Sequence, residues 1–80
     1  MAFKQQEKKA EAMRTLAKTP EELMYWAGFL RGLLRAHHGE RFGTFEEHEA
    51  WLSQEDSPDP LQAACGRGYR KGLAALKTRS

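Results

Sequence analysis

The 80-residue chain contains neither valine nor isoleucine, and this absence constrains its fold more than any other feature. β-Branched and aromatic residues are the ones that pack the pleated surface of a sheet. The only β-branched residues are four threonines, and two of them, Thr19 and Thr44, stand where helix caps are expected. Ala, Leu, Glu, Lys, Arg and Gln are frequent, and all of them favour helices. The sequence therefore predicts an all-α fold.

The length allows one small domain, because independent domains commonly contain about 100 to 150 residues. We expect residues 1–80 to form a small bundle of three to four helices joined by short loops. The predicted helices cover residues 20–38, 45–54 and 60–77, and residues 1–18 form a further helix that frays at its start.

Three cap signals fix the starts of the later helices. Thr19 precedes Pro20, and Pro suits the first helical position. Thr44 is followed three residues later by Glu47, which is the spacing of a capping box. Asp59 is a good N-cap directly before Pro60. A left-handed C-cap at Gly39 is predicted to end the helix over residues 20–38.

The predicted last helix contains three internal glycines, Gly66, Gly68 and Gly72. Each costs up to about 1 kcal/mol relative to Ala, so something must offset the loss. Close approach of a neighbouring backbone or a large ring is the favoured interpretation, and approach of another molecule's backbone is the alternative. In the short helix over residues 45–54, we expect Phe45, Trp51 and Leu52 to point inward.

Charge is strongly segregated along the chain, although the net charge is only +2. Residues 1–39 carry a net charge of +3, residues 40–59 carry −6, and residues 60–80 carry +5 without a single acid. Such a small net charge does not by itself predict a nucleic-acid-binding protein, so the distribution matters more.

Two charged faces are candidate partner-binding sites. Arg67, Arg70, Lys71 and Lys77 point away from the apolar stripe of the last helix, and Arg31 and Arg35 are expected to extend this basic face. It would hold phosphates or an acidic protein surface, unless it is simply solvated. Acidic residues that would meet a basic groove form the second candidate: Glu46, Glu47, Glu49, Glu55 and Asp56. Alternatively, Glu46 and Glu47 only complement the N-terminal end of their helix.

No pattern in the sequence points to catalysis, a metal or a cofactor. The soft ligands are His37, His38, His48 and Cys65, and no zinc-type spacing joins them. Cys65 falls on an apolar stripe, where a buried and inert thiol is expected. We therefore expect a protein that is not an enzyme. No apolar run is long enough for a membrane span, and a cytoplasmic location is expected.

An internal pattern carries a family resemblance. Residues 28–33 and 68–73 both read Gly-aromatic-x-x-Gly-Leu, and Pro58 and Pro60 precede the second copy. This arrangement resembles the two-helix pattern of ribosome modulation factors and their small phage-borne relatives, over about half of the chain. It departs from them in the acidic segment at 44–54 and in lacking a Cys-Pro-Tyr loop. The resemblance implies binding to ribosomes or RNA.

The short, helical and charge-segregated sequence also resembles the accessory proteins of phages and mobile elements, including anti-CRISPR proteins. That resemblance implies an inhibitor, acting in the cytoplasm of a host cell, that blocks access of DNA to a host nucleoprotein complex. Two functions are thus expected: a non-enzymatic inhibitor that occupies a host complex, or an RNA- or ribosome-binding regulator with Tyr69 available for base stacking. The small core also leaves a homodimer open.

Overall fold

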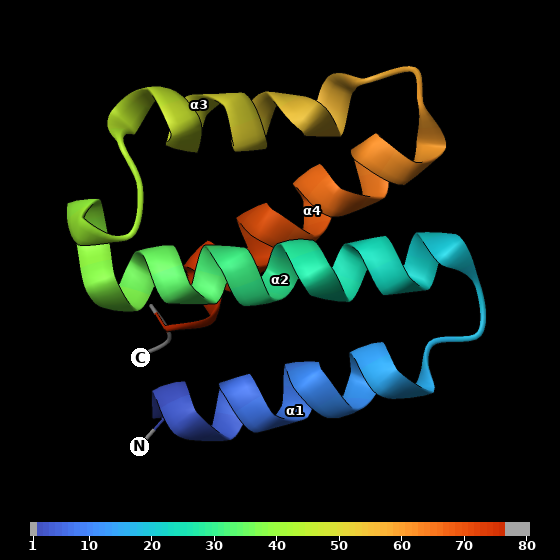
Figure 1. The fold of residues 1–80 in the computed structure, drawn as a ribbon, viewed down its shortest axis with the longest axis horizontal. Helices are drawn as coiled ribbons and strands as arrows, with labels where there is room; N and C mark the ends of the chain where they lie inside the picture. The colour runs from blue at the N-terminus through green and yellow to red at the C-terminus, as the bar shows by residue number, and fades with distance from the viewer. Residues whose placement is uncertain (1, 77–80) are drawn as a thin grey trace.

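The computed structural model describes the backbone of residues 2–76 and all their side chains except those of Ala2 and Glu40. This part of the chain contains four α-helices and two short 3₁₀ helices, and no strand (Figure 1). In chain order they are α1 (Ala2–Leu16), α2 (Pro20–His38), η1 (Gly39–Arg41), α3 (Phe45–Ser53), η2 (Gln54–Asp56) and α4 (Pro60–Ala75). The predicted all-α class is confirmed.

The predicted caps start the helices as expected. The Thr19 hydroxyl accepts a hydrogen bond from the Glu22 amide at 3.1 Å. Thr44 and Glu47 form a complete capping box, in which each side chain accepts from the other residue's amide. At the end of α2, Gly39 adopts a positive φ of 68°, where a glycine is favoured.

Helix ends differ slightly from the predicted ones. The helix predicted over residues 1–18 ends at Leu16, and α3 ends at Ser53 before a tighter 3₁₀ turn. α4 ends at Ala75, and the predicted end at residue 77 lies outside the described residues. Such differences of one or two residues are ordinary at helix ends, which fray.

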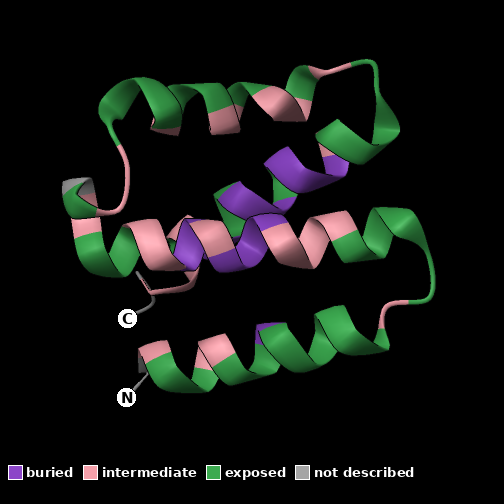
Figure 2. Ribbon diagram, in the orientation of Figure 1, coloured by how far each residue is buried: buried purple, intermediate pink, exposed green. Residues whose placement is uncertain are grey.

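α2 and α4 cross at the centre of the molecule with their backbones in unusually close contact. A Cβ atom added at Gly28 would collide with the Cys65 carbonyl, and one at Gly32 would collide with the Tyr69 carbonyl. The residue contacted on α4 moves from 65 to 69 as the glycine on α2 moves from 28 to 32, so the residue numbers increase together. The two helices therefore run parallel, as Figure 1 also shows. The buried residues concentrate at this crossing (Figure 2). We call it the glycine seam.

The α4 side of the glycine seam repeats the α2 side. A Cβ at Gly68 would meet the Tyr25 carbonyl, and one at Gly72 would meet the Phe29 carbonyl. Equivalent positions of the two helices are forty residues apart in the sequence. Each glycine contacts, on the other helix, the equivalent of the residue three positions before it: Gly28 contacts Cys65, the equivalent of Tyr25, and Gly68 contacts Tyr25 itself. The two helices are therefore related by an approximate twofold axis through the seam, and their common Gly-aromatic-x-x-Gly-Leu pattern is the sequence basis of this symmetry.

The same symmetry describes the rest of the fold. α1 runs antiparallel to α2, and α3 with η2 runs antiparallel to α4, so the chain consists of two helical hairpins (Figure 1). Three residues connect the helices of each hairpin, 17–19 and 57–59, and both are followed by a proline at the first helical position. Residues 39–44 join the two hairpins.

The two hairpins are held in different ways. α1 covers an apolar cluster in which Ala10 and Leu33 are fully buried, and Phe3 and Trp26 pack at its edges. In contrast, none of the residues of α3 or η2 is fully buried. Among the described residues, no helix has both the length and the apolar character needed to cross a membrane.

Replacing Gly68 by Ala tests the glycine seam. In an ordinary helix this change stabilises the protein by up to about 1 kcal/mol. Here the new methyl group meets the Tyr25 backbone, and we expect a loss of about 1–3 kcal/mol in the free energy of unfolding, measured by urea denaturation. Ala74→Gly, at an exposed position of α4, is the control for helix propensity alone. A Gly68→Ala variant as stable as the wild type would contradict the close approach.

Candidate binding surface

Arg31 of α2 contacts two aromatic rings, one in the segment between the hairpins and one in α3. Its guanidinium carbon lies 4.8 Å from the centre of the Phe42 ring and 4.7 Å from that of Trp51. A cation over an aromatic face is attracted by the ring quadrupole. The charge predicted to extend a basic face is therefore placed between two rings.

Arg35, one turn further along α2, holds the loop before α3. Its Nη1 atom donates to the backbone carbonyls of Gly43 and Thr44. The same loop is closed by the capping box, because the Glu47 carboxylate accepts from the Thr44 amide at 3.2 Å. Arg35 and Glu47 thus hold the start of α3, so Glu47, a member of the predicted acidic patch, has a partner inside the fold.

Arg70 of α4 forms an ion pair with Glu55 of η2, which directly follows the C-terminal end of α3. Its Nε and Nη2 atoms donate to the two carboxylate oxygens at 2.9 and 2.6 Å, which is a bidentate pair. The guanidinium holds the pKa of Glu55 below its ordinary value of 4.5, more by hydrogen bonding than by Coulombic attraction alone. Arg31, Arg35 and Arg70 together form what we call the arginine clamp.

Tyr69 supplies a further contact at the centre of the clamp. Its hydroxyl group and the His48 Nδ1 atom lie 2.7 Å apart in a hydrogen bond, and its ring packs beside Trp51. Burial raises the pKa of the hydroxyl, while Arg35 and Arg31 oppose the shift. Only 2% of Tyr69 is exposed, so the expectation that it is available for base stacking is wrong. The α3 hairpin covers its ring.

The outer surface of α3 presents acids that have no hydrogen-bond or ion-pair partner among the described residues. Glu46 and Glu49 are exposed and form no hydrogen bond or ion pair with other described residues. We call these two residues the acidic edge. Phe45 lies beside them with 62% of its surface exposed, so the prediction that it points inward is wrong. The inner side of α3 is occupied instead by His48, Trp51 and Leu52, which come later in the helix.

The predicted basic face is divided by the structure. Arg67 and Lys71 are exposed on α4, but Arg67 shares a hollow of about 420 Å³ with Glu21, Glu22 and the Tyr25 side chain. Arg70 is paired with Glu55, and Lys77 lies outside the described residues. Arg31 and Arg35 are on the side of α2 that faces the α3 hairpin. The positive charges therefore do not gather into one free face.

The soft ligands of the sequence do not come together. Within residues 2–76, no group of three or more His, Cys, Asp and Glu side chains is placed to hold a metal ion. His37 stacks on Phe3 with ring centres 3.9 Å apart, which ties α1 to the end of α2. Cys65 is only 3% exposed, and burial raises the pKa of its thiol although Arg31 opposes the shift. The cysteine is therefore held as a protonated thiol in the core.

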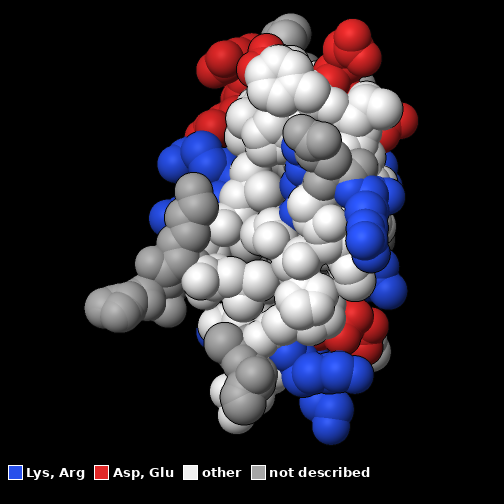
Figure 3. Space-filling model, turned by 90° about the vertical axis from the view of Figure 1, so that its left-hand side faces the viewer, with Lys and Arg blue, Asp and Glu red and all other residues white. Residues whose placement is uncertain are grey.

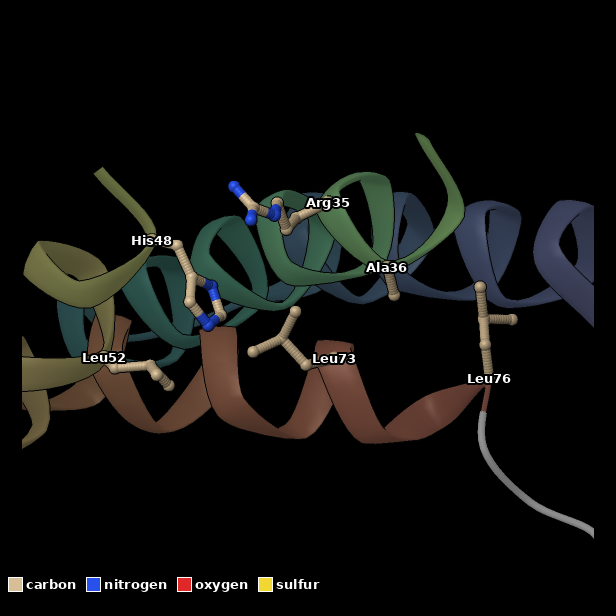
Figure 4. A pocket seen from close by; sticks show the side chains of 6 residues that line it. All are labelled: Arg35, Ala36, His48, Leu52, Leu73 and Leu76. Atoms are coloured by element: carbon tan, nitrogen blue, oxygen red, sulfur yellow. The ribbon is translucent and has the colours of Figure 1, made fainter. Parts of the chain in front are cut away.

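A groove lies between α3 and the ends of α2 and α4 (Figure 4). Its volume is about 500 Å³, which is within the range of ligand-binding clefts. The lining residues come from the three helices and the C-cap of α4: Arg35, Ala36, His48, Leu52, Leu73 and Leu76. Figure 3 shows the molecule from this end: most of the middle of the surface is uncharged, with some basic atoms within it, and acidic side chains gather over α3 at the top.

Sequence reasoning did not find the groove or the exposed Phe45. Leu52 and Leu73 are apolar residues of amphipathic helices, and nothing in the local sequence distinguishes a leucine at the edge of a groove from one in a core. Phe45 is the first residue of its helix, directly after the Thr44 cap. That position was the available signal, because a side chain at a helix start often extends beyond the packed surface.

Replacing Arg31 by Met tests the arginine clamp. The change keeps the side-chain stem and removes the charge, so the attraction to Phe42 and Trp51 is lost. We expect the free energy of local opening of α3 to fall by about 1 kcal/mol, giving roughly fivefold faster amide hydrogen exchange there. Lys71→Met removes the same charge at the equivalent position of α4 and serves as the control. Equal exchange in both variants would contradict the clamp.

The Arg70–Glu55 pair predicts a pH dependence. Because the pKa of Glu55 is lower in the folded state, its contribution is present above its ordinary value of 4.5 and is lost as the pH falls through the lowered value. We expect wild type and Glu55→Gln to converge in unfolding free energy between about pH 7 and about pH 3. Glu46→Gln removes an unpaired acid and is the control. A stability difference that stays constant with pH would contradict this role for the pair.

Comparison with known proteins adds no relative. No protein family model, curated protein or solved structure matches the chain. What the protein does must therefore follow from the surfaces described above.

Proposed function

We propose that the protein is a non-enzymatic binding protein that occupies a basic surface of a host nucleoprotein complex and thereby inhibits it. The acidic edge carries this proposal. Glu46 and Glu49 are exposed and form no hydrogen bond or ion pair with other described residues, whereas the Glu47 and Glu55 carboxylates are hydrogen-bonded within the fold. Carboxylates without a partner inside the fold are available to a partner protein.

The surroundings of the acidic edge also favour a protein partner. Phe45 exposes most of its ring next to two carboxylates, and exposed aromatic side chains commonly anchor protein interfaces. A basic groove that normally holds nucleic acid would be complementary in charge to Glu46 and Glu49. An anti-CRISPR protein that keeps target DNA from its effector complex is one case of this mechanism.

RNA or ribosome binding is less favoured by the same geometry. Of the six basic residues predicted to form one face, Arg31, Arg35 and Arg70 have partners inside the fold. Arg67 lies near two carboxylates, which weakens its attraction for phosphate. Arg67 and Lys71 remain the residues that a nucleic-acid partner would use.

Capture from bacterial lysate by the tagged protein, with nuclease and at two salt concentrations, tests the proposal. We expect the wild type to retain a defined protein complex after nuclease treatment and to inhibit its binding to nucleic acid. Glu46→Lys/Glu49→Lys should lose most of the capture, about tenfold or more, because like charges then face each other.

Two further variants make this result specific. Glu11→Lys/Glu21→Lys changes the net charge equally at exposed positions of α1 and α2, and should keep the capture. Arg67→Glu/Lys71→Glu should also keep it. Retention of nucleic acid that vanishes with nuclease and in the Arg67/Lys71 variant would instead support the RNA-binding function and overturn the proposal.

A further inference from the structure

Two polar residues line the groove between α2, α3 and α4, and each has a hydrogen-bond partner within the protein. Arg35 donates to two backbone carbonyls, and the His48 Nδ1 atom is hydrogen-bonded to the Tyr69 hydroxyl. The rest of the lining is Ala36 and three leucines. Four of the six lining residues are thus apolar, and this part of the lining favours an apolar side chain as the occupant.

On the α3 side, the exposed side chain next to the groove is negatively charged. In a helix, residues four and seven positions after Phe45 lie along the same side, and these are Glu49 and the groove residue Leu52. Glu49 of the acidic edge therefore lies near the groove, with exposed Phe45 one turn before it, whereas Glu46 lies further round the helix. An occupant held by both features combines an apolar side chain with positive charges beside it.

We propose that the groove receives an apolar side chain from a lysine- or arginine-rich segment of a partner protein, while the acidic edge contacts the flanking positive charges. This inference rests on the proposed function and specifies the partner's chemistry. An amphipathic helix is the natural form of such a segment, because its apolar and basic residues lie on adjoining faces. The buried side chain supplies affinity, and the charges set orientation.

A pair of synthetic peptides tests the groove directly. The first is a fluorescently labelled helical peptide with lysines on one face and leucines on the other, and the second has serine in place of each leucine. Burying a leucine changes affinity by roughly tenfold or more, so the wild type should bind the leucine peptide that much more tightly in an anisotropy titration.

Variants of the protein separate the two parts of the site. Ala36→Trp fills the groove from an exposed position of α2 and should remove the preference for leucine over serine. Glu46→Lys/Glu49→Lys should weaken binding of both peptides. The matched controls, Ala12→Trp on the exposed side of α1 and Glu11→Lys/Glu21→Lys, should leave both affinities unchanged.

Equal binding of the two peptides by the wild type, or an unchanged preference in Ala36→Trp, would overturn the proposal. Chemical-shift changes at the methyl groups of Ala36 and Leu73 on adding the leucine peptide to the wild type provide a readout that needs no variant. Capture from lysate that depends on Glu46 and Glu49 but is unaffected by Ala36→Trp would refute the groove and keep the proposed function. Capture that is independent of Glu46 and Glu49 would refute the proposed function itself.

Discussion

The contact between the backbones of α2 and α4 determines how everything else in this protein is arranged. Four glycines, Gly28, Gly32, Gly68 and Gly72, allow each helix to rest on the carbonyl groups of the other. Glycine lowers the stability of a helix. Van der Waals contacts along the whole crossing must therefore stabilise the fold by at least as much as the glycines destabilise the two helices. The parallel direction then requires a long connection, and that connection contains α3, the acidic edge and one wall of the groove.

The approximate twofold symmetry clarifies why the two hairpins differ in character. α1 and α3 occupy equivalent places beside the glycine seam, yet α1 packs by apolar contacts and α3 is held by the arginine clamp. Charged and aromatic contacts allow α3 to keep a mostly polar surface while it remains docked. A helix held in this way can present Glu46, Glu49 and Phe45 to a partner without contributing a fully buried residue to the core.

Much of the fold could be predicted from local sequence, because caps and glycines act locally. Thr19, Thr44 and Asp59 start their helices as expected, and the glycines of α4 do mark a close helix approach. The fate of the arginines could not be predicted, since whether a residue on an outer helix face meets solvent depends on what the connecting segment covers. For the same reason, the exposures expected for Phe45 and Tyr69 were wrong in opposite directions.

The most direct test of this account is a measurement of proton–proton contacts across the glycine seam by nuclear magnetic resonance in solution. The account predicts reciprocal contacts from the α protons of Gly28 to Cys65 and from those of Gly68 to Tyr25, with the same pattern one turn later. An antiparallel pairing would instead bring Gly28 close to Gly72. Observation of that pattern, or of no contacts between the two helices, would contradict the seam and with it the placement of the acidic edge and the groove.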